Sequence, residues 1–419
     1  MKKFLTMLLT LVLAVSSLGL FTACGGDDGD GEGGNEKIAA LICLHGEGSS
    51  YDANFINAFK AACKAKGLTE EQYTIVVDIP EDEPAYEKAA EFADEGYKVI
   101  FGDSFGHEQF LIKAAREFPN VQFCHATGTA GGFLITESTD DDPPANFHNA
   151  FASIYEGRYL AGVAAGLKLV ELYGDANQAV SDANAKIGYV GAWPFAEVKS
   201  GLTSFFLGVK SIVPNVTMEV RFTNSWYDPV AEQTAAEALI QGGAKLVSGH
   251  ADSYGVPTAC KNAGIPNVFY NGTTEEDTFV IASKINWQPY FEHMLDGVMV
   301  EGKSIVKDYC GTLATGSVEI TALGKAAAAG TQAKLDEVKA KLMSGEIKVF
   351  DCSTFTVGGQ PLTEYLADVI DDGTFTGETN VIKTEGGKTY FAESEFRSAP
   401  YFDLIIDGIT VGADIPSQS

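Results

Sequence analysis

A short motif raises the question of catalysis. Residues 102–106 read GDSFG, which fits the G-x-S-x-G pattern that holds the nucleophile of many serine hydrolases on a sharp turn between a strand and a helix. The motif follows the apolar run YKVIF and precedes a helix-like stretch, HEQFLIKAAREF. Upstream, LHGEGSS at 44–50 resembles the histidine-glycine loops that form oxyanion holes in esterases. Ser104 is therefore a candidate nucleophile and, equally, a candidate ligand-binding hydroxyl.

A serine hydrolase would also need an acid and a histidine, in the chain order Ser, acid, His. His293 lies within an amphipathic helix pattern, and His250 precedes Asp252, which reverses that order. Chain order alone does not decide, because a triad is defined by its geometry. We favour a binding loop without catalytic residues, in which Ser104 caps a helix or contacts ligand and Phe105 packs at the rim. A lipid-anchored serine hydrolase remains the alternative.

Three histidines suggest a second chemistry. His45, His125 and His250 each end a predicted strand, and together with Asp252 they could bind zinc or a related metal. They are far apart in the sequence and come from two predicted lobes. We therefore expect no metal and no other cofactor, and keep a metal-binding solute receptor as an alternative.

The N-terminus predicts export and lipidation. Lys2 and Lys3 precede the apolar stretch FLTMLLTLVLAVSSLGLF and then TAC, which is typical of a secretory signal peptide over residues 1–23. The segment LFTAC resembles a bacterial lipobox, so cleavage before Cys24 and acylation of its thiol, with palmitate among the acyl chains, are expected. Two acyl chains would make membrane attachment stable. A plain signal peptide or an uncleaved anchor is the alternative.

Residues 24–36 form a predicted tether. They are rich in Gly, Asp and Glu, and such a stretch buries too little surface to offset its ordering entropy. No later run reaches the roughly 18 apolar residues that a spanning helix needs. We therefore expect an extracytoplasmic protein that is held at the cell membrane by its lipid anchor alone.

The charge balance excludes several partners. The chain has 57 acidic and 29 basic residues, and its net charge of −28 would become −30 once the two signal-peptide lysines are removed. Nucleic acids and anionic lipids bind basic patches, so neither is an expected partner. We interpret the acid excess as a source of solubility and expect a monomer.

The rest of the chain predicts an α/β protein with two lobes. Continuous apolar strand-like runs alternate with amphipathic helical stretches over 37–150, and a similar series covers 151–303, which we assign mainly to the second lobe with crossovers. Such alternation indicates a mostly parallel, doubly wound sheet flanked by helices in each lobe. The extension 304–419 is expected to complete the lobes. It includes a predicted helix at 325–344 and a strand-like run, FDLIIDGITV, at 402–411.

The cysteines give little further information. None of the six beyond the lipobox has C-x-x-C spacing. Cys43 and Cys124 lie within apolar strand-like runs, where a free cysteine behaves as a small hydrophobic residue. A disulfide between Cys310 and Cys352 is possible in an extracellular protein, although the sequence does not establish it.

Several segments together resemble one protein family. They are SIYEGRYLAGVAAGL, KIGYVGAWPFAEVKSGLTSFFLGVKSIVPNV, NSWYDPVAEQTAAEALIQGGAKLVSGHADS and FCHATG. In order and spacing, residues 38–300 look like the basic-membrane-protein (BMP) family of substrate-binding lipoproteins, also called purine nucleoside receptor-like proteins. The resemblance implies a two-lobed, type I-like periplasmic-binding-protein fold. It also implies a partner in the membrane, an ABC permease or a sensor.

The resemblance further implies a ligand. Family members with known ligands commonly hold purine nucleosides between two aromatic rings, and stacking stabilises such complexes by roughly 1–3 kcal/mol per base. The segment SWYDP matches the motif of the second stacking ring, which places Trp226 there. Asp252 falls where the family offers a backbone group to ribose, and Asn271 falls at a ribose-binding aspartate.

The first binding segment, HGEGSSYDANFINAF, departs from the D-D-K-S-F-N-Q pattern of the family's nucleoside receptors. Tyr51 is the ring available for stacking and Asn54 the available amide, whereas Phe55 is expected in the core. Trp287 is a further aromatic candidate. The predicted ligand-binding set is Tyr51, Asn54, Ser104, Phe105, Trp226, Asp252, Asn271 and Trp287.

These observations lead to one prediction of function. The protein is expected to be the substrate-binding lipoprotein of an ABC importer. It would capture a nucleoside or a related heterocycle by closing two lobes around it, without performing chemistry on it.

Overall fold

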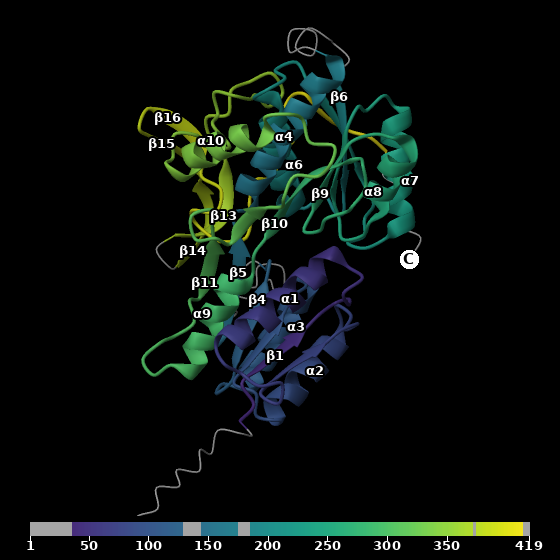
Figure 1. Cartoon of the computed structure of the whole chain (residues 1–419). Helices are drawn as coiled ribbons and strands as arrows, with labels where there is room; N and C mark the ends of the chain where they lie inside the picture. The colour runs from purple at the N-terminus through teal and green to yellow at the C-terminus, as the bar shows by residue number, and fades with distance from the viewer. Residues whose placement is uncertain (1–35, 129–143, 175–184, 372–373, 414–419) are drawn as a thin grey trace, which may run out of the picture. The chain divides into compact units, whose positions relative to one another are not determined.

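The folded part of the chain is built around two large sheets (Figure 1). The structure, a computed structural model, describes residues 36–128, 144–174, 185–371 and 374–413. Both sheets consist mainly of parallel strands covered by helices, so the predicted fold class is confirmed.

The first sheet has the strand order β11-β5-β4-β3-β1-β2, and all its pairs are parallel. Alternate residues of β1 face opposite layers. Ala39 and Leu41 pack with helix α1, whereas Ala40 and Ile42 pack with α2 and α3. Burial on both faces explains why these strands read as continuous apolar runs. The elements are β1 (Ala39–Ile42), α1 (Ser50–Ala65), β2 (Tyr73–Val76), α2 (Glu83–Asp94), β3 (Val99–Gly102), the 3-10 helix η1 (Phe105–His107), α3 (Glu108–Glu117), β4 (Gln122–Ala126), β5 (Phe147–Ala152), α9 (Gln288–Met299) and β11 (Asp308–Gly311).

The second sheet has the order β12-β10-β9-β8-β6-β7-β17. Only β12 is antiparallel to its neighbour. Ile187 of β6 packs in the layer of α4 and α6, whereas Val190 packs with α7 and α8. The elements are α4 (Ile154–Tyr173), β6 (Lys186–Gly191), α6 (Ala196–Lys210), β7 (Thr217–Phe222), α7 (Pro229–Gln241), β8 (Val247–His250), α8 (Gly255–Ala263), β9 (Asn267–Tyr270), β10 (Phe279–Ile285), β12 (Val318–Ile320) and β17 (Ile409–Val411).

The two sheets share one topology. The added edge strands are left aside, and the remaining five strands of each sheet are numbered 1 to 5 in the order in which they occur in the chain. Both sheets then have the spatial order 2-1-3-4-5, which is β2-β1-β3-β4-β5 in the first and β7-β6-β8-β9-β10 in the second. Sheets of this doubly wound type bind ligands in the crevice beyond the carboxyl ends of their strands. The loops that follow β1, β3, β6, β8 and β9 are therefore the expected source of a site.

The C-terminal part of the chain supplies edge strands to both sheets. β11 pairs with β5 of the first sheet, whereas β12 and β17 pair with β10 and β7 of the second. Helix α10 and two antiparallel hairpins complete the extension (Figure 1). Their bounds are α10 (Thr331–Met343), β13 (Leu366–Asp371), β14 (Thr374–Asn380), β15 (Ile382–Glu385) and β16 (Lys388–Phe391).

Two sequence predictions in this region were too long. The helix expected at 325–344 begins only at Thr331, because Gly330 adopts a left-handed conformation (φ 81°) that interrupts a right-handed helix. Of the strand-like run at 402–411, only Ile409–Val411 pairs as a strand.

Close packing of two helices explains the small residues of α4. A Cβ atom added to Gly162 would lie 2.1 Å from the carbonyl oxygen of Phe205 in α6, and one added to Gly208 would lie 2.2 Å from that of Tyr159 in α4. The two backbones can approach this closely only because both positions are glycine.

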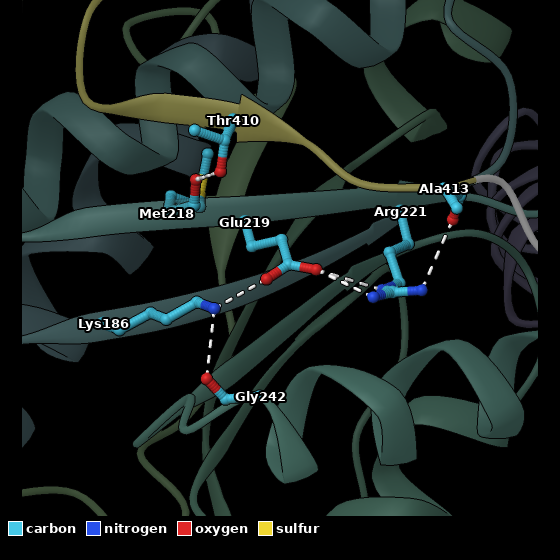
Figure 2. A network of polar contacts seen from close by, with 7 residues as sticks. All are labelled: Lys186, Met218, Glu219, Arg221, Gly242, Thr410 and Ala413. Carbon is cyan, nitrogen blue, oxygen red and sulfur yellow. Dashed lines mark hydrogen bonds and ion pairs between the residues drawn. The ribbon is translucent and has the colours of Figure 1, made fainter.

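A polar network lies at the edge where β17 joins the second sheet (Figure 2). The Glu219 carboxylate of β7 accepts from Lys186 Nζ of β6 at 2.6 Å and from Arg221 Nη2 at 2.9 Å. Arg221 also donates to the carbonyl of Ala413, and the Thr410 hydroxyl donates to the carbonyl of Met218. The network therefore connects three neighbouring strands.

Other predictions concern the termini and the cysteines. The predicted signal peptide and Cys24 lie outside the described residues, as does the tether up to residue 35. Across the described ranges, every helix is too short or too polar to cross a bilayer. Cys310 and Cys352, the pair considered for a disulfide, both have free thiols, as do the buried Cys43 and Cys124.

Candidate functional site

A narrow cavity lies at the carboxyl ends of strands from both sheets. It spans about 390 Å³ of space, part of it open to solvent, and little of that space is wide enough to hold a water molecule. The cavity is therefore a slot that must widen to admit a ligand larger than a water molecule. Its lining residues are Leu44, Tyr51, Ser104, Phe105, Thr127, Glu197, Trp226, His250, Asp252 and Tyr270.

The structure brings together five of the eight predicted binding residues. Tyr51, Ser104 and Phe105 line the cavity from the first sheet, and Trp226 and Asp252 line it from the second. The other three, described below, lie outside the lining set.

Aromatic side chains form much of the cavity wall. Tyr51 in the first turn of α1 is oriented by a 2.8 Å hydrogen bond from its hydroxyl to the carbonyl of Asp103. Phe105 lies with its ring centroid 5.8 Å from that of Phe195, which in turn is 6.2 Å from the ring of Trp226. The two sheets thus contribute rings to one continuous aromatic surface, on which a planar ligand could stack.

Two carboxyl groups face the same space. Burial raises the pKa of Glu197 to about 7. Burial, followed by the negative charges of Asp52, Glu232, Glu197 and Glu81, raises the pKa of Asp252 well above its usual range. Among the described residues, neither side chain has a basic partner. Each is therefore available to accept a hydrogen bond from a ligand.

Sequence reasoning missed Glu197, and a signal for it existed. Strand β6 ends at Gly191 and α6 begins at Ala196, so an acidic residue at 197 follows a strand's carboxyl end directly. Leu44, Thr127 and Tyr270 also follow or end strands and were not predicted as binding residues. His250 was considered as a metal ligand and as a catalytic histidine, but not as a ligand-binding residue.

The GDSFG loop is held by an acid from another element. Glu81 Oε1 accepts from the Ser104 hydroxyl at 2.6 Å and from the backbone N–H of Gly106 at 2.7 Å. A Cβ atom at position 106 would lie 2.6 Å from Glu81 Cδ, so glycine leaves room for this carboxylate. The side chain of Ser104 makes no capping hydrogen bond to η1, and that part of the prediction was wrong.

The same contacts disfavour a catalytic serine. A nucleophilic serine needs a histidine within hydrogen-bond reach of its hydroxyl. His125 Nε2 bonds instead to the Ser104 carbonyl at 2.7 Å, and His107 Nε2 bonds to the carbonyl of Ile79. Ser104 therefore lacks the proton acceptor that the hydrolase alternative requires among the described residues.

Three predicted residues lie beside the cavity and do not line it. Asn54 donates to the carbonyl of Ile285 and, at 3.4 Å, to Asn271 Oδ1, so these two amides link α1 to the end of β9. Trp287 is 1% exposed and stacks on Phe55 with ring centroids 4.3 Å apart. Phe55 is buried, as predicted, and Trp287 shares its core.

The proposed metal ligands are engaged separately. His125 bonds to Ser104, His250 Nδ1 to the hydroxyl of Tyr189, and the ring of His45 packs 5.2 Å from that of Tyr227. Among the described residues, the potential metal ligands that lie together are Cys43, Asp52 and Asp103, so the three imidazoles and Asp252 form no common centre there.

A buried acidic pair supports the loop after β1. Asp103 Oδ1 accepts from the backbone N–H of Leu44 at 3.1 Å, and Asp52 Oδ1 accepts from that of His45 at 2.7 Å. Burial, followed by the charge of Asp52, raises the pKa of Asp103 well above its usual range. The neutral form of Asp103 removes a like-charge repulsion, and the pair fixes the backbone that presents Leu44 to the cavity.

The fold and the cavity define a solute-binding protein with two doubly wound sheets. The comparison with known families agrees. The chain belongs to the Bmp family of PnrA-like ABC transporter substrate-binding proteins, whose model matches residues 47–352. The family prediction from the sequence is therefore confirmed, and the family is one of substrate-binding proteins.

Several curated relatives carry names that mention a ligand. The chain is 33% identical over 232 residues to a purine-binding protein of Brucella abortus, covering 54% of this chain and 59% of the relative. It is 28% identical over 289 residues to a Haloferax volcanii protein provisionally named as an ABC transporter glucose-binding protein. That match covers 68% of this chain and 66% of the relative. The chain thus spans less than two thirds of the length of either relative.

Solved structures show the same fold at lower identity. A solute-binding protein from Aeropyrum pernix gives a TM-score of 0.59 at 17% identity, covering 75% of this chain and 93% of that one. A solute-binding protein from Conexibacter woesei gives a TM-score of 0.57 at 20% identity, and the match covers 74% of this chain and 98% of that one. These likenesses support the fold alone.

Proposed function

We propose that this protein is an extracytoplasmic receptor that captures a purine nucleoside or related heterocycle for import by an ABC permease. The observation that carries the proposal is the narrow cavity between the two sheets, with aromatic walls and two carboxyl groups. Family membership supports the role of substrate binding.

The aromatic walls favour a flat ligand. Tyr51, Phe105 and Trp226 come from different elements and line one slot. A purine has two faces of π electrons, and each stacked ring contributes roughly 1–3 kcal/mol to binding. A slot this narrow would suit a planar group better than a bulky one.

The carboxyl groups favour a ligand with hydrogen-bond donors. Glu197 and Asp252 face a cavity whose described lining contains no lysine or arginine. Ribose hydroxyls and the N–H groups of a base are donors that such acceptors would bind. An anionic ligand such as a nucleotide would meet the ionised form of Glu197 and no basic side chain of the described lining, so we expect nucleosides and bases to bind more tightly than nucleotides.

Sugars are the second candidate. Carboxylates and aromatic rings also suit a sugar, and one relative is provisionally named for glucose binding. A ligand panel should therefore contain inosine, guanosine, adenosine, hypoxanthine, inosine monophosphate and glucose.

The proposal is tested by calorimetry and thermal shift on the purified protein. A bound ligand raises the melting temperature by mass action, so at least one nucleoside or purine base should do so. Trp226→Ala should weaken that binding by about tenfold or more, in line with the loss of one stacked ring. Tyr86→Ala is the matched control, because Tyr86 is an aromatic residue of α2 that lies outside the lining set.

Two results would contradict the proposal. Binding of glucose without any purine would replace the nucleoside with a sugar. Unchanged affinity in Trp226→Ala would show that the ring of Trp226 does not contribute to ligand binding.

A further inference from the structure

A buried arginine lies behind the cavity without an acidic partner. Arg158 of α4 is fully buried, and it forms no ion pair within the described ranges. Its guanidinium carbon lies 5.1 Å from the ring centroid of Tyr189, 5.6 Å from that of Phe205 and 5.4 Å from that of Tyr270. Aromatic faces can stabilise such a cation, but they leave its positive field to act on neighbouring groups.

Arg158 begins a chain of hydrogen bonds that ends at the cavity. Its Nη2 donates to the hydroxyl oxygen of Tyr189. That hydroxyl lies 2.9 Å from Nδ1 of His250, a residue that lines the cavity. A tyrosine hydroxyl has a single proton to donate, so the direction of the second bond decides the tautomer of the imidazole.

The arginine sets that direction. An arginine can only donate, so the Tyr189 oxygen is the acceptor of the first bond. If Nδ1 also donated to Tyr189, the tyrosine proton would be buried without an acceptor among the described residues. In the alternative, Tyr189 donates to Nδ1 and the imidazole proton lies on Nε2, so both partners of the Tyr189–His250 bond are satisfied and only Nε2–H is left open.

The imidazole is also held in its neutral form. Burial, followed by the charge of Arg158, lowers the pKa of His250 well below its usual value. A neutral ring with a protonated Nε2 has one donor to offer, and Nε2 has no hydrogen-bond partner among the described residues. An unsatisfied buried donor destabilises a protein, so an acceptor that bonds to this N–H would remove an energetic penalty.

The packing of the ring leaves the Nε2 side for a ligand. A Cβ atom added to Gly201 of α6 would lie 2.6 Å from His250 Cε1 and 2.7 Å from Nδ1, so this edge is in close contact with the helix. The ring of Tyr270 covers the imidazole at a centroid distance of 4.5 Å.

We infer that Arg158 and Tyr189 position His250 as a specificity-determining donor, whose Nε2–H bonds to an acceptor on the bound ligand. The inference rests on the proposed function and names one feature of its ligand: a carbonyl oxygen or an unprotonated ring nitrogen. Glu197 and Asp252 accept from ligand donors, whereas His250 recognises an acceptor. A ligand that presents only donors on this side leaves the Nε2–H unsatisfied.

Two substitutions of His250 separate the roles of its nitrogens. The amide nitrogen of glutamine reaches approximately the position of Nε2, whereas that of asparagine reaches that of Nδ1. With inosine as the probe, His250→Gln should retain affinity within about fivefold, and His250→Asn should lose about twentyfold or more, as expected for an unpaired polar group. His293→Gln, in helix α9 outside the lining set, is the control.

The tautomer has a direct spectroscopic readout. In protein labelled with 15N in its histidine rings, the resonances that disappear in His250→Gln belong to His250. Long-range proton–nitrogen spectra should show the Nε2–H form, and inosine should shift that nitrogen. Tyr189→Phe should produce a mixture of tautomers and weaken inosine binding, although the substitution leaves the ligand-facing residues Glu197 and Trp226 in place.

Each outcome has a separate meaning. An Nδ1–H tautomer, or equal affinity in the Gln and Asn variants, overturns the inference while the proposed function stands. If no panel member binds, the proposed function fails, and the spectrum of the free protein still decides the tautomer.

Discussion

At the scale of single residues, the cavity should respond to pH through Glu197. Its pKa of about 7 lies above the ordinary value of 4.5, so the group loses its proton as the pH rises through neutrality. A ligand hydroxyl or N–H bonds more strongly to the ionised form, and affinity should therefore rise with pH. For inosine, the dissociation constant should fall by about tenfold between pH 6 and pH 8 if only the ionised form binds.

Calorimetry across this range checks the prediction. Glu197→Gln should remove most of the pH dependence, because an amide does not titrate. Glu237→Gln, on the exposed surface of α7, should retain it. An unchanged pH profile in Glu197→Gln would assign the dependence to another group.

The residues of the site could be predicted only in part. Trp226 was predicted from the resemblance of SWYDP to the family's stacking motif, Tyr51 from the family's first binding segment, and Ser104 from the GDSFG loop. All three follow parallel strands, whose carboxyl ends meet at one edge of a sheet, so chain position gives approximate location. Trp287 and Asn54 also follow strands. However, the side chain of Trp287 turns into the core, and that of Asn54 turns toward Asn271. Side-chain direction depends on packing partners that are distant in the sequence, and no local pattern encodes it.

At the scale of elements, the edge network of Figure 2 should contribute to stability. Lys186, followed by Arg221, lowers the pKa of Glu219. A lowered pKa means that the charged carboxylate stabilises the fold at pH values above the ordinary 4.5, and that this contribution disappears as the pH falls below it. Glu219→Gln should reduce the free energy of unfolding by about 1–2 kcal/mol at pH 7.

Thermal melts at pH 7 and pH 3.5 measure the effect. The difference between wild type and variant should shrink at the lower pH. Glu337→Gln is the control, because Glu337 pairs with Lys334 and Lys341 on an exposed helix face where solvent screens the charges. A larger loss in the control than in Glu219→Gln would contradict a role for the network.

The core strands were predictable from the sequence, whereas the added edges were not. Strands such as β1 and β3 are buried on both faces and appear as apolar runs. Strands β11 and β12 are short and partly exposed, with sequences DYCG and VEI that carry no clear alternation. Their pairing is decided by tertiary contacts, which explains why the sequence indicated only that the extension completes the lobes.

At the scale of the whole molecule, we predict that membrane attachment depends on Cys24. Cys24→Ser should abolish labelling by palmitate and move the protein from the membrane fraction to the soluble fraction, because the acyl chains would be the only anchor. Ligand binding should be unchanged. Persistence of the variant in the membrane fraction would indicate an uncleaved N-terminal segment instead.

The edge strands of the extension also constrain the order in which the chain can fold. β17 comprises Ile409–Val411, so the second sheet acquires its last strand only after the chain has been synthesised up to that point, about 190 residues after β7. Until then β7 has one unpaired edge, whereas the edge of β5 is covered once β11 ends at Gly311. An unpaired edge is open to incorrect pairing with other chains. The second sheet is therefore completed much later in synthesis than the first, and β7 is the strand that stays open to mispairing longest.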